Sequence, residues 1–470
     1  MNINNIEITG LTDDSRKVQP GYAFFAVRGK DEDGTKYIPA ALEKGAAIIV
    51  TDEDYQGKSF KVPNVRRLLI EKAVELFKPL PENIIAVTGT SGKTSVVHFC
   101  RYILENLGKD AASIGSLGLV RKGVTAPMGS AHNTSPNPIL LCEELNKLKT
   151  QGCDYIALEA TSAGIEQDRM TALPIKVAAF TNFSRDHIGP REHASMEEYF
   201  NAKRKLFDTV LPRDGTAVLN ADIEQYPDLL EACDGCKIIS YGKAGENIRL
   251  LDLAQSEKGL GVTAAINGKV YDFGLGATGE FQAHNAMCAI GMVMGLGFDA
   301  ADVVKAIEGA PAPAGRMQYV GSPVKGGGVY VDFAHGPDQI INVLKAARVF
   351  CKGRLMIIVA ASGKRDRGKR PIMGKAAHDF ADVVYVTDDN PRTEDPAQIR
   401  ADVASGCPGA IEIAGRAEAI ARAMSDMKEN DILVIVNKGH EDFVEIGTEF
   451  IPFSDFEEVR KCLEKMDKKQ

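Results

Sequence analysis

The stretch IIAVTGTSGKT, residues 84–94, places a short apolar run directly before a glycine-rich turn. The run IIAVT has the composition of a buried strand, and the apolar pattern from Ser95 through Leu107, closed by Gly108, predicts a helix after the turn. Such a turn can close its backbone N–H groups around a phosphate, while a lysine adds positive charge and a threonine offers a hydroxyl to Mg²⁺. We therefore predict that a nucleotide binds to the loop residues Gly89, Thr90, Ser91, Gly92, Lys93 and Thr94.

One position separates this loop from the general phosphate-loop pattern, GxxxxGKS or GxxxxGKT. The first glycine of that pattern falls at position 87, which is Val87 here, so the loop is a shortened variant. An ordinary glycine turn is the alternative interpretation. The strand before the turn and the helix after it favour phosphate binding.

Length and two proline-bearing linkers divide the chain. A chain of 470 residues is too long for one core and suits about three domains. The linkers KPLPEN at 78–83 and GAPAPAGRM at 309–317 predict domains at 1–80, 81–312 and 313–470. In the second and third domains, helical patterns alternate with short runs of β-branched and apolar residues, which are IIAVT, YIALEA and VAAFTN, then GVYVDF, LMIIVA, VVYVT and ILVIV. This alternation predicts an α/β fold with parallel sheets, which bind ligands at the carboxyl ends of their strands.

Charge, hydropathy and cysteine usage argue against several classes of protein. The net charge of −8, without a dominant basic block, argues against nucleic-acid binding. No apolar run approaches the ~20 residues that cross a bilayer, and MNINNIEITGL lacks a signal segment, so we expect a cytoplasmic protein without a membrane span. The nine cysteines lie mostly inside apolar segments, so they are expected to be reduced core residues. The close pair Cys233 and Cys236 lacks the second pair that would support a zinc site.

The stretch SMEEYFNAKRKLF, residues 195–207, predicts an amphipathic helix with a lysine on its apolar face. Aromatic residues lie one turn before and one turn after Lys203, at the spacing that puts them on the same face. Ser195 and Glu198 form the capping-box signature S-x-x-E at the start of the helix. For Lys203 taken alone, the alternative is snorkelling, in which the stem covers apolar surface and the ammonium reaches water.

Several motifs occur in the order found in the Mur ligases, and this resemblance extends from about residue 8 to the carboxyl terminus. They are GTSGKT, NTSP, LEATS, TNFSRDH, EEYFNAKRKLF, GEFQAHNA, GRM, VDFAH, GKRPIMG, DDNPRTEDP and NKGHED. The chain is most similar to the members that add meso-diaminopimelate as the third residue of the peptidoglycan stem peptide. The resemblance implies an amino-terminal UDP-binding α/β domain, a central ATP-binding phosphate-loop domain with a parallel sheet, and a Rossmann-like carboxyl-terminal domain.

The resemblance also implies the reaction. Mur ligases use ATP to convert a carboxylate into an acyl phosphate that an amine attacks, here joining meso-diaminopimelate to the UDP-muramoyl dipeptide. Such phosphoryl transfer depends on positioning and charge neutralisation. By resemblance, the catalytic residues are Lys93, Lys203, His187 and Glu159, and the Mg²⁺ ligands are Thr94, Glu159, His187 and Lys203.

Lys203 has a special role in this resemblance. The matching lysine of the family carries a carbamate formed with CO₂, which turns a cation into an anionic oxygen ligand. Burial suits this reaction because it favours the neutral amine. A plain ion pair of Lys203, for example with Glu159, is the alternative.

Other positions match the family's substrate contacts. Ser15 in LTDDSRKV matches a contact to UDP. The muramoyl dipeptide is expected at Asn133, Thr134, Ser135, Thr161, Gln167 and Arg169. The rest of the nucleotide is expected at Asn285, Arg316 and Asp332. Among these, an arginine can clamp a carboxylate or phosphate through two parallel hydrogen bonds. We expect a monomer.

The segment DNPR follows the run VVYVT and bears on the choice of amino acid. Its Asn-Pro turn is rigid and aims Arg392 into the cleft. Family members that add meso-diaminopimelate typically have DNPR, whereas lysine-adding members usually lack the arginine. The distal carboxylate of diaminopimelate suits a bidentate arginine, and the ammonium of lysine is repelled by it. The amino acid is therefore expected at Arg365, Asp389, Asn390, Pro391, Arg392, Asn437 and Glu441.

Two positions depart from the family's usual pattern around this site. Asn437 stands where the diaminopimelate-adding members usually have glycine, and Lys364 stands where an aspartate is common. A basic solvated loop, GKRDRGKR, is the alternative for the second segment, and it fits Lys364, Arg367 and Arg370 better than Arg365.

Three other functions remain open at this point. The chain could add another amino acid such as L-lysine, it could be a related ATP-dependent amide ligase such as a folylpolyglutamate synthetase, or it could be a nucleotide-gated binding module without ligase activity. The Ser15 region and DNPR argue against the second possibility. Thr94, Glu159, His187 and Lys203 together offer more chemistry than a switch needs.

Overall fold

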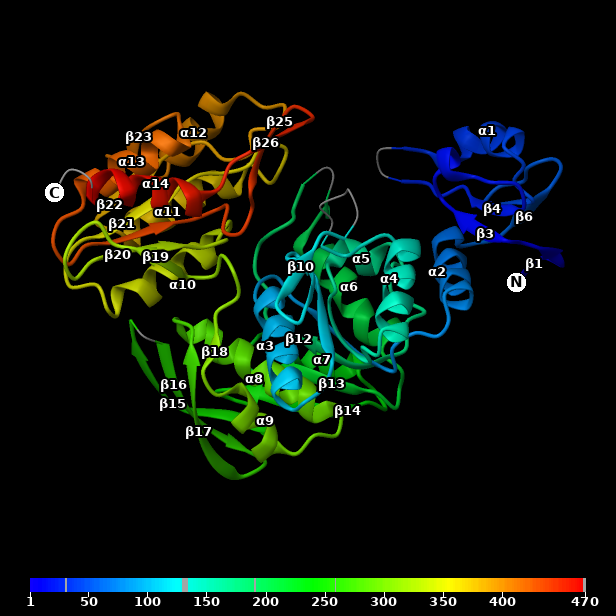
Figure 1. The fold of residues 1–470 in the computed structure, drawn as a ribbon, viewed down its shortest axis with the longest axis horizontal. Coiled ribbons are helices and arrows are strands. Elements are labelled where there is room, and N and C mark those ends of the chain that lie inside the picture. Colours follow the sequence, from blue (N-terminus) through cyan, green and yellow to red (C-terminus); the bar gives the residue numbers. More distant parts are fainter. Residues whose placement is uncertain (30–31, 129–133, 190–191, 258, 468–470) are drawn as a thin grey trace.

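The computed structural model describes residues 1–29, 32–128, 134–189, 192–257 and 259–467, and its elements gather around three principal sheets (Figure 1). The amino-terminal sheet has four parallel strands, which are β3 (Gly10–Thr12), β4 (Tyr22–Phe25), β5 (Ile48–Thr51) and β6 (Ser59–Lys61). With it lie the hairpin β1 (Asn2–Ile3) and β2 (Ile6–Glu7), the 3₁₀ turns Ser15–Lys17 and Gly34–Tyr37, and the helices α1 (Ile38–Glu43) and α2 (Val65–Leu76). In Figure 1 this part forms one end of the molecule.

The central sheet has twelve strands in the order β10–β9–β8–β11–β7–β12–β13–β14–β15–β16–β17–β18. The apolar runs of the sequence form its parallel middle strands, which are β7 (Asn83–Thr88), β11 (Tyr155–Glu159) and β12 (Ile175–Phe180). The other strands are β8 (Ala111–Gly115), β9 (Gly118–Arg121), β10 (Val124–Ala126), β13 (Thr216–Asn220), β14 (Lys237–Gly242), β15 (Ile248–Ser256), β16 (Gly259–Ile266), β17 (Lys269–Gly276) and β18 (Ala310–Pro311).

The central sheet is mixed rather than wholly parallel, which corrects the sequence-based expectation. β9 and β10 form an antiparallel hairpin beside β8, and β15, β16 and β17 form an antiparallel meander. Asn267 and Gly268 connect β16 to β17 with φ of 49° and 81°. Two-residue hairpin turns of this kind strongly prefer Asn-Gly, so the dipeptide was a signal for this hairpin.

Helices cover both faces of the central sheet (Figure 1). In β7, Ile84 and Ala86 face one core while Ile85 and Val87 face the other, as the two-residue period of a strand requires. The Ile85 face packs on α3 (Lys93–Asn106), α8 (Glu280–Gly295) and α9 (Ala300–Ile307). The opposite face packs on α4 (Pro138–Thr150), α5 (Ser162–Glu166), α6 (Met196–Lys205) and α7 (Tyr226–Ala232). Because both faces are covered, the middle strands are apolar along their length.

The carboxyl-terminal sheet has six strands in the order β19–β20–β24–β21–β22–β23, and only β19 runs antiparallel to its neighbour. The strands are β19 (Gln318–Gly321), β20 (Gly328–Val331), β21 (Leu355–Val359), β22 (Val383–Val386), β23 (Ile411–Glu412) and β24 (Ile432–Ile435). The helices are α10 (Pro337–Arg348), α11 (Lys369–Phe380), α12 (Pro396–Ala404), α13 (Arg416–Asp426) and α14 (Asp455–Asp467). A separate hairpin consists of β25 (Phe443–Ile446) and β26 (Glu449–Pro452).

Helix α6 forms as expected and continues as a π-helix over Leu206–Val210. The Ser195 hydroxyl accepts the Glu198 N–H at 3.1 Å, which is the first half of a capping box. The Glu198 carboxylate, however, accepts the N–H of Ala194 rather than that of Ser195. The capping contacts therefore also hold the residue that precedes the cap.

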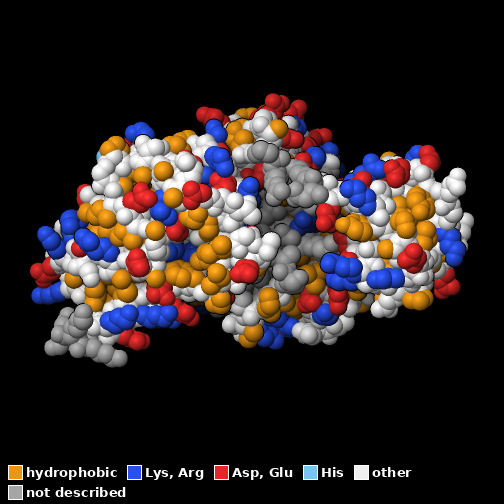
Figure 2. Space-filling model, turned by 90° about the horizontal axis from the view of Figure 1, so that it is seen from above, with side chains coloured by type: hydrophobic (Ala, Val, Ile, Leu, Met, Phe, Trp, Pro, Cys, Tyr) orange, Lys and Arg blue, Asp and Glu red, His pale blue; other side chains and the backbone are white. Residues whose placement is uncertain are grey.

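The surface carries charges of both signs. Lysine, arginine, aspartate and glutamate side chains are interspersed over the face shown in Figure 2. Within the ranges that the structure describes, no helix is both long enough and apolar enough to cross a membrane. The nine cysteines are free thiols, as predicted, and most of them are buried.

Candidate active site

A cavity of about 1430 Å³ is lined by both the central and the carboxyl-terminal sheets. Its walls come from the segments after β7, β11 and β12 and from the loops after β20, β21, β22 and β24. These loops follow the carboxyl ends of parallel strands, where open α/β sheets bind their ligands. The cavity therefore brings together segments that are far apart in the sequence.

The glycine-rich loop leads from β7 into α3, which begins at Lys93, earlier than the sequence predicted. Gly92 has φ of 88°, and a Cβ there would come within 2.3 Å of Asn285 Oδ1, so the loop excludes a side chain at this position. Lys93 Nζ donates hydrogen bonds to the carbonyls of Gly89 at 2.8 Å and Thr90 at 2.9 Å. Burial lowers the pKa of Lys93. The lysine is thus held against its own loop by contacts that a phosphate could replace.

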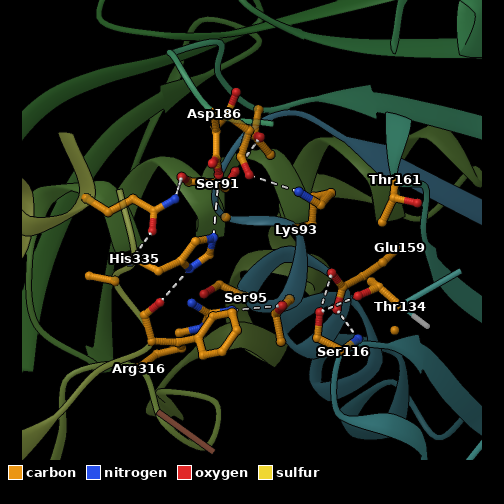
Figure 3. Close-up of a pocket in the computed structure, with 18 of the residues that line it drawn as sticks. Ser91, Lys93, Ser95, Ser116, Thr134, Glu159, Thr161, Asp186, Arg316 and His335 are labelled. Carbon is orange, nitrogen blue, oxygen red and sulfur yellow. Dashed lines mark hydrogen bonds and ion pairs between the residues drawn. The ribbon is translucent and has the colours of Figure 1, made fainter. Parts of the chain in front are cut away.

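The carboxyl-terminal sheet reaches this loop directly (Figure 3). Arg316 Nη2 donates to Thr94 Oγ1 at 3.1 Å, and the Arg316 guanidinium lies 4.7 Å from the centre of the Phe333 ring. Gln339 Nε2 donates to Ser91 Oγ at 2.8 Å. Burial lowers the pKa of Arg316. A half-buried cation from the third part of the chain therefore lies beside the helix terminus that is expected to bind phosphate.

Glu159, the last residue of β11, presents a buried carboxylate to the cavity (Figure 3). Its Oε1 accepts the Ser116 N–H at 2.9 Å, and its Oε2 lies 3.3 Å from the Ser116 hydroxyl. No ion pair to Glu159 occurs among the described residues. Gly115 leaves the space for this side chain, because a Cβ there would come within 2.2 Å of Glu159 Oε1.

Lys203 is buried, with 1% of its surface exposed, so the snorkelling interpretation is wrong. Its Nζ donates to the Gly89 carbonyl at 2.8 Å and lies 4.3 Å from the centre of the Tyr199 ring. Burial lowers the pKa of Lys203 well below that of an exposed lysine, and the neighbouring ammonium of Lys93 lowers it further. Within the described parts of the chain, Lys203 has no carboxylate at ion-pair distance, so the alternative pair with Glu159 is also wrong.

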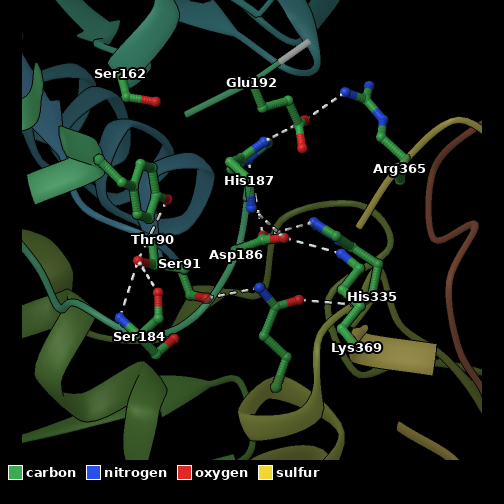
Figure 4. Close-up of polar contacts among 12 residues, drawn as sticks. Thr90, Ser91, Ser162, Ser184, Asp186, His187, Glu192, His335, Arg365 and Lys369 are labelled. Carbon is green, nitrogen blue, oxygen red and sulfur yellow. Dashed lines mark hydrogen bonds and ion pairs between the residues drawn. The ribbon is translucent and has the colours of Figure 1, made fainter. Parts of the chain in front are cut away.

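Asp186 links the central and carboxyl-terminal sheets, and sequence reasoning missed it (Figure 4). Its Oδ1 lies 2.9 Å from Lys369 Nζ, and its Oδ2 lies 3.4 Å from His335 Nε2. Burial acts to raise the pKa of Asp186, but His187, Lys369 and His335 hold it well below the usual value. Asp186 stands inside the quoted motif TNFSRDH and Lys369 inside GKRPIMG, so the motifs were the available signal.

His187 joins a second chain of contacts across the cavity (Figure 4). Its Nδ1 lies 2.9 Å from Glu192 Oε1, and the same oxygen lies 2.7 Å from Arg365 Nη1. His187 has φ of 55°, an uncommon conformation for a residue other than glycine. The structure thereby connects a candidate metal ligand to a candidate amino-acid contact through a carboxylate that sequence reasoning did not single out.

The interpretation of GKRDRGKR as a solvated loop is wrong for Arg370. The Arg370 guanidinium is buried and pairs with Glu394 at 3.0 Å and with Asp402 at 2.9 Å. Lys364 and Arg367 are exposed, as that interpretation required, although Arg367 also pairs with Glu394 at 2.9 Å. The carboxylates that make Arg370 a buried residue lie outside the segment, where a local pattern cannot reveal them.

The segment around DNPR forms a buried charged network with the loop after β24. Lys438 Nζ is fully buried and lies 3.5 Å from Asp389 Oδ1, 3.6 Å from Glu441 Oε2 and 3.2 Å from Asn390 Oδ1. Asn390 Nδ2 donates to Glu441 Oε2 at 3.0 Å. Burial and the nearby Asp389 raise the pKa of Glu441. Arg392 lines the cavity beside this network, and Pro391 is the residue before Arg392 in the chain.

Asn437 also lines the cavity, and its backbone explains why glycine is usual there. Its φ is 88°, in the left-handed region that favours glycine. The side chain is buried and its Oδ1 accepts the Ala360 N–H at 2.8 Å. Asparagine is among the few other residues that tolerate this conformation, so the departure fits the backbone.

The residues expected to hold the muramoyl dipeptide gather near the end of β11. Ser135 Oγ donates to the Glu159 carbonyl at 3.0 Å and lies 2.9 Å from Thr161 Oγ1. Arg169 donates to the Ser135 carbonyl and, at 2.8 Å, to Gln167 Oε1. Two other positions were predicted for the muramoyl dipeptide. Thr134 Oγ1 lies 3.2 Å from the Ser116 hydroxyl, and Asn133 lies outside the described residues.

Three further predicted positions differ in their place relative to the cavity. Asp332 is buried and accepts the backbone N–H groups of Met317 and Ala334, each at 2.7 Å. Asn285 donates to Gln282 at 3.1 Å and lies against Gly92 of the phosphate loop. Both residues line the cavity, whereas Ser15 lies in a half-buried 3₁₀ turn of the amino-terminal part and is not among the lining residues as described.

Comparisons with known proteins cover nearly the whole chain. The model of the Mur ligase family catalytic domain matches residues 7–89, that of the Mur ligase middle domain matches residues 87–293, and that of the Mur ligase glutamate ligase domain matches residues 315–439. A protein of Caulobacter vibrioides, named UDP-N-acetylmuramoyl-L-alanyl-D-glutamate–2,6-diaminopimelate ligase, is 41% identical over 469 residues, which cover 98% of this chain and 96% of that protein. The chain belongs to the Mur ligase family. The resemblance noted in the sequence is thus confirmed.

Solved structures of Mur ligases share the fold. A structure of a UDP-N-acetylmuramoyl-L-alanyl-D-glutamate–2,6-diaminopimelate ligase aligns with a TM-score of 0.71 at 30% identity and covers 98% of this chain and 95% of its own. The MurF ligase from Thermotoga maritima in complex with ADP aligns with a TM-score of 0.66 at 18% identity over 100% of both chains, which supports the fold alone. The predicted α/β fold is therefore confirmed.

Proposed function

We propose that this Mur ligase uses ATP to join meso-2,6-diaminopimelate to UDP-N-acetylmuramoyl-L-alanyl-D-glutamate, a step of peptidoglycan precursor biosynthesis. The observation that carries the proposal is that one cavity contains the phosphate loop, the buried carboxylate of Glu159, the buried amine of Lys203 and the two arginines Arg365 and Arg392. A ligation of this kind needs a nucleotide, a metal site and a site for a dicarboxylic amino acid in mutual reach. We assign the reaction to a monomer in the cytoplasm, where ATP is available.

The phosphates of ATP are assigned to the loop 89–94 and the amino end of α3. Lys93 and Arg316 are the cations that would bind the phosphate oxygens, and both are half-buried and line the cavity. Cations in a half-buried site act more strongly on charge that develops during phosphoryl transfer than exposed ones do, because water screens them less. Lys93 must exchange its two carbonyl contacts for phosphate oxygens when the nucleotide binds.

The residues present fit a magnesium site. Glu159 is a buried carboxylate that no described cation pairs with, Thr94 offers a hydroxyl, and Lys203 as a carbamate would add anionic oxygen. Hard oxygen ligands of this type suit Mg²⁺, and phosphate oxygens and water complete its coordination. His187 is assigned to a second Mg²⁺ site beside the first. When bound, Mg²⁺ neutralises the phosphate charge that opposes attack by a carboxylate.

The residues expected to hold Mg²⁺ do not form a preassembled cluster. Among the described residues, no three histidine, cysteine, aspartate or glutamate side chains converge to hold a metal ion. The proposed set has only two such side chains, Glu159 and His187, so the hydroxyl, the carbamate and the substrates must supply the rest. The carbamate on Lys203 is the further anionic oxygen ligand that the chain itself would add to this set.

The proposed reaction has two steps. A carboxylate oxygen of the D-glutamate residue forms a bond to the γ-phosphorus of ATP while the bond to the leaving ADP breaks, which yields an acyl phosphate. The amine of diaminopimelate then attacks the acyl carbon, phosphate leaves, and the amine loses a proton. Arg169 and Ser135 are assigned to orient the muramoyl dipeptide, and the contacts of Asp186 with Lys369 and His335 would help to exclude water by holding the two sheets together.

The space that Gly115 leaves for Glu159 provides a test of the metal assignment. Gly115→Ala places a Cβ within 2.2 Å of Glu159 Oε1 and must displace the carboxylate. We expect the Mg²⁺ concentration for half-maximal velocity to rise about tenfold or more, since misplacing the support of a metal ligand typically costs this much affinity. The stabilisation of the protein by Mg²⁺ and ADP, followed by thermal unfolding, should fall in parallel.

The matched control for this variant is Gly261→Ala. Its Cβ would meet Ala254 at 3.7 Å, an ordinary contact in a strand outside the cavity. An unchanged Mg²⁺ dependence in Gly115→Ala, with the control also unchanged, would show that Glu159 does not hold the ion.

The proposed function is tested by a ligation assay with purified protein. UDP-muramoyl dipeptide, ATP and Mg²⁺ are mixed with meso-diaminopimelate, L-lysine or L-ornithine, and the product is identified by mass. We expect the diaminopimelate tripeptide with release of ADP and phosphate. A lysine product would favour the lysine-adding alternative, and ATP consumption without any joined amino acid would favour the binding module. Ligation of glutamate to a folate would favour a folylpolyglutamate synthetase.

A further inference from the structure

The guanidinium of Arg392 is held on one edge by Glu445, a residue of β25. Arg392 Nε donates to Glu445 Oε2 at 2.7 Å, and Arg392 Nη1 donates to the Gly363 carbonyl at 2.6 Å. The backbones are joined as well, because the Arg392 N–H donates to the Glu445 carbonyl at 3.0 Å and the Gly447 N–H donates to the Arg392 carbonyl at 2.8 Å. With Nε occupied, an incoming carboxylate is left with the Nη side of the guanidinium.

The same contacts hold the backbone of Arg392 in an uncommon conformation. Its φ is 53°, in the left-handed region. Glu445 also donates its N–H to Asn390 Oδ1 at 3.0 Å, and Lys438 Nζ donates to that oxygen at 3.2 Å. The DNPR turn and the hairpin of β25 and β26 therefore form one unit, in which Glu445 makes both a backbone and a side-chain contact to Arg392.

The Glu445 carboxylate contacts a lining residue, Arg392, without lining the cavity itself. Arg392 and Phe443 are among the residues that line the cavity, whereas Glu445 is not. The Arg392 and Glu445 side chains are 19% and 23% exposed, so their charges are only partly screened by water. A negative charge this close to the guanidinium weakens its attraction for a second carboxylate and also weakens its repulsion of an ammonium.

We propose that Glu445 is a positioning residue that sets the affinity and selectivity of Arg392 for the distal end of the amino acid. The inference rests on the proposed function, which places the diaminopimelate carboxylate at Arg392. The hydrogen bond of Glu445 fixes the guanidinium, and its charge reduces the preference for a distal carboxylate over a distal ammonium. The two effects act in opposite directions, so they can be separated by substitution.

Glu445→Gln separates the charge from the hydrogen bond, because the amide oxygen can still accept from Arg392 Nε. We expect this variant to lower the KM for meso-diaminopimelate about threefold, the range of a partly exposed ion pair, with the KM values for ATP and the UDP-substrate unchanged. Inhibition by L-lysine should weaken by a similar factor. Glu445→Ala removes both effects, and its KM for meso-diaminopimelate should rise above that of the native enzyme.

The control is Glu449→Gln, which removes the same charge from an exposed position of the same hairpin. Its kinetic constants should match those of the native enzyme, and thermal unfolding checks that all three variants fold. A KM for meso-diaminopimelate that is unchanged or raised in Glu445→Gln overturns the inference, as does a similar fall in Glu449→Gln.

Binding and ligation by the native enzyme separate this inference from the proposed function. Calorimetry measures meso-diaminopimelate binding in the presence of the UDP-substrate and a non-hydrolysable ATP analogue. If the native enzyme neither binds nor ligates meso-diaminopimelate, the proposed function and the inference both fall. If it does both, and Glu445→Gln binds no more tightly, only the inference falls.

Discussion

Lys203→Ala is expected to lower kcat about 10³-fold, the loss typical of removing one preorganised group that stabilises transferring charge. The buried amine of Lys203 lies beside the phosphate loop, where it donates to the Gly89 carbonyl at 2.8 Å and pairs with no described carboxylate. A carbamate at this position would turn a poorly solvated amine into a metal ligand. Alanine can neither carry the carbamate nor replace its charge.

The test compares steady-state turnover with a spectroscopic signal. Native activity should fall in buffer depleted of CO₂ and return when bicarbonate is added, whereas Lys203→Ala should not respond. With ¹³C-labelled bicarbonate, the native protein should show a carbamate resonance in ¹³C spectra that the variant lacks. Turnover of Lys203→Ala close to native in CO₂-depleted buffer would falsify the role of this side chain.

Loss of the fold would be a trivial cause of the same result, and Lys203→Met controls for it. At neutral pH the unfolded lysine is charged, while burial lowers the pKa of the folded Lys203 well below its usual value. The unfolded state therefore binds the proton more tightly than the folded state does, and this linkage lowers the stability of the native enzyme as the pH falls below the ordinary lysine pKa. Methionine fills similar volume without this cost, so its free energy of unfolding should equal or exceed that of the native enzyme.

The strands that the sequence predicted are those buried on both faces of a sheet. IIAVT, YIALE and VAAF are continuous apolar runs, and each became a middle strand of the central sheet. The meander of β15 to β17 escaped prediction because its strands are partly exposed and alternate in burial, although the Asn267-Gly268 turn was a usable signal. Continuous apolar runs thus predicted the middle strands of the central sheet but not the strands toward its edge.

The charged residues of the cavity were harder to predict, because their environment depends on partners far away in the sequence. Lys369 and Arg370 belong to a segment that looks solvated, yet both are buried by contacts to Asp186, Glu394 and Asp402. Local composition cannot distinguish a solvated cation from one whose carboxylate arrives from another sheet. The family resemblance supplied candidate roles for Lys203 and His187, but it did not reveal the contacts that surround them.

Arg392→Ala is expected to lower kcat/KM for meso-diaminopimelate about 100-fold, or ~3 kcal/mol, the upper range for losing hydrogen bonds between charged groups. The loss should appear mainly in the KM for this amino acid, with the KM for ATP little changed, because the side-chain hydrogen bonds of Arg392 go to Glu445 and Gly363 and not to the phosphate loop. Activity with L-lysine should fall much less or rise, since the variant no longer repels an ammonium. The ratio of the two kcat/KM values is the quantity to measure.

The double variant Arg392→Ala, Glu445→Gln tests whether Glu445 acts through Arg392. If Glu445 acts only through the guanidinium, its charge has no effect once Arg392 is replaced. The KM for meso-diaminopimelate should then be the same in the double variant as in Arg392→Ala. Two residues that acted independently would instead show the same threefold fall in both backgrounds, about threefold being the effect expected of the single charge. Such additivity would show that Glu445 does not act through Arg392. A diaminopimelate preference that survives Arg392→Ala would place the recognition of the distal carboxylate at another residue, and Arg365 is the first candidate because it lines the same cavity.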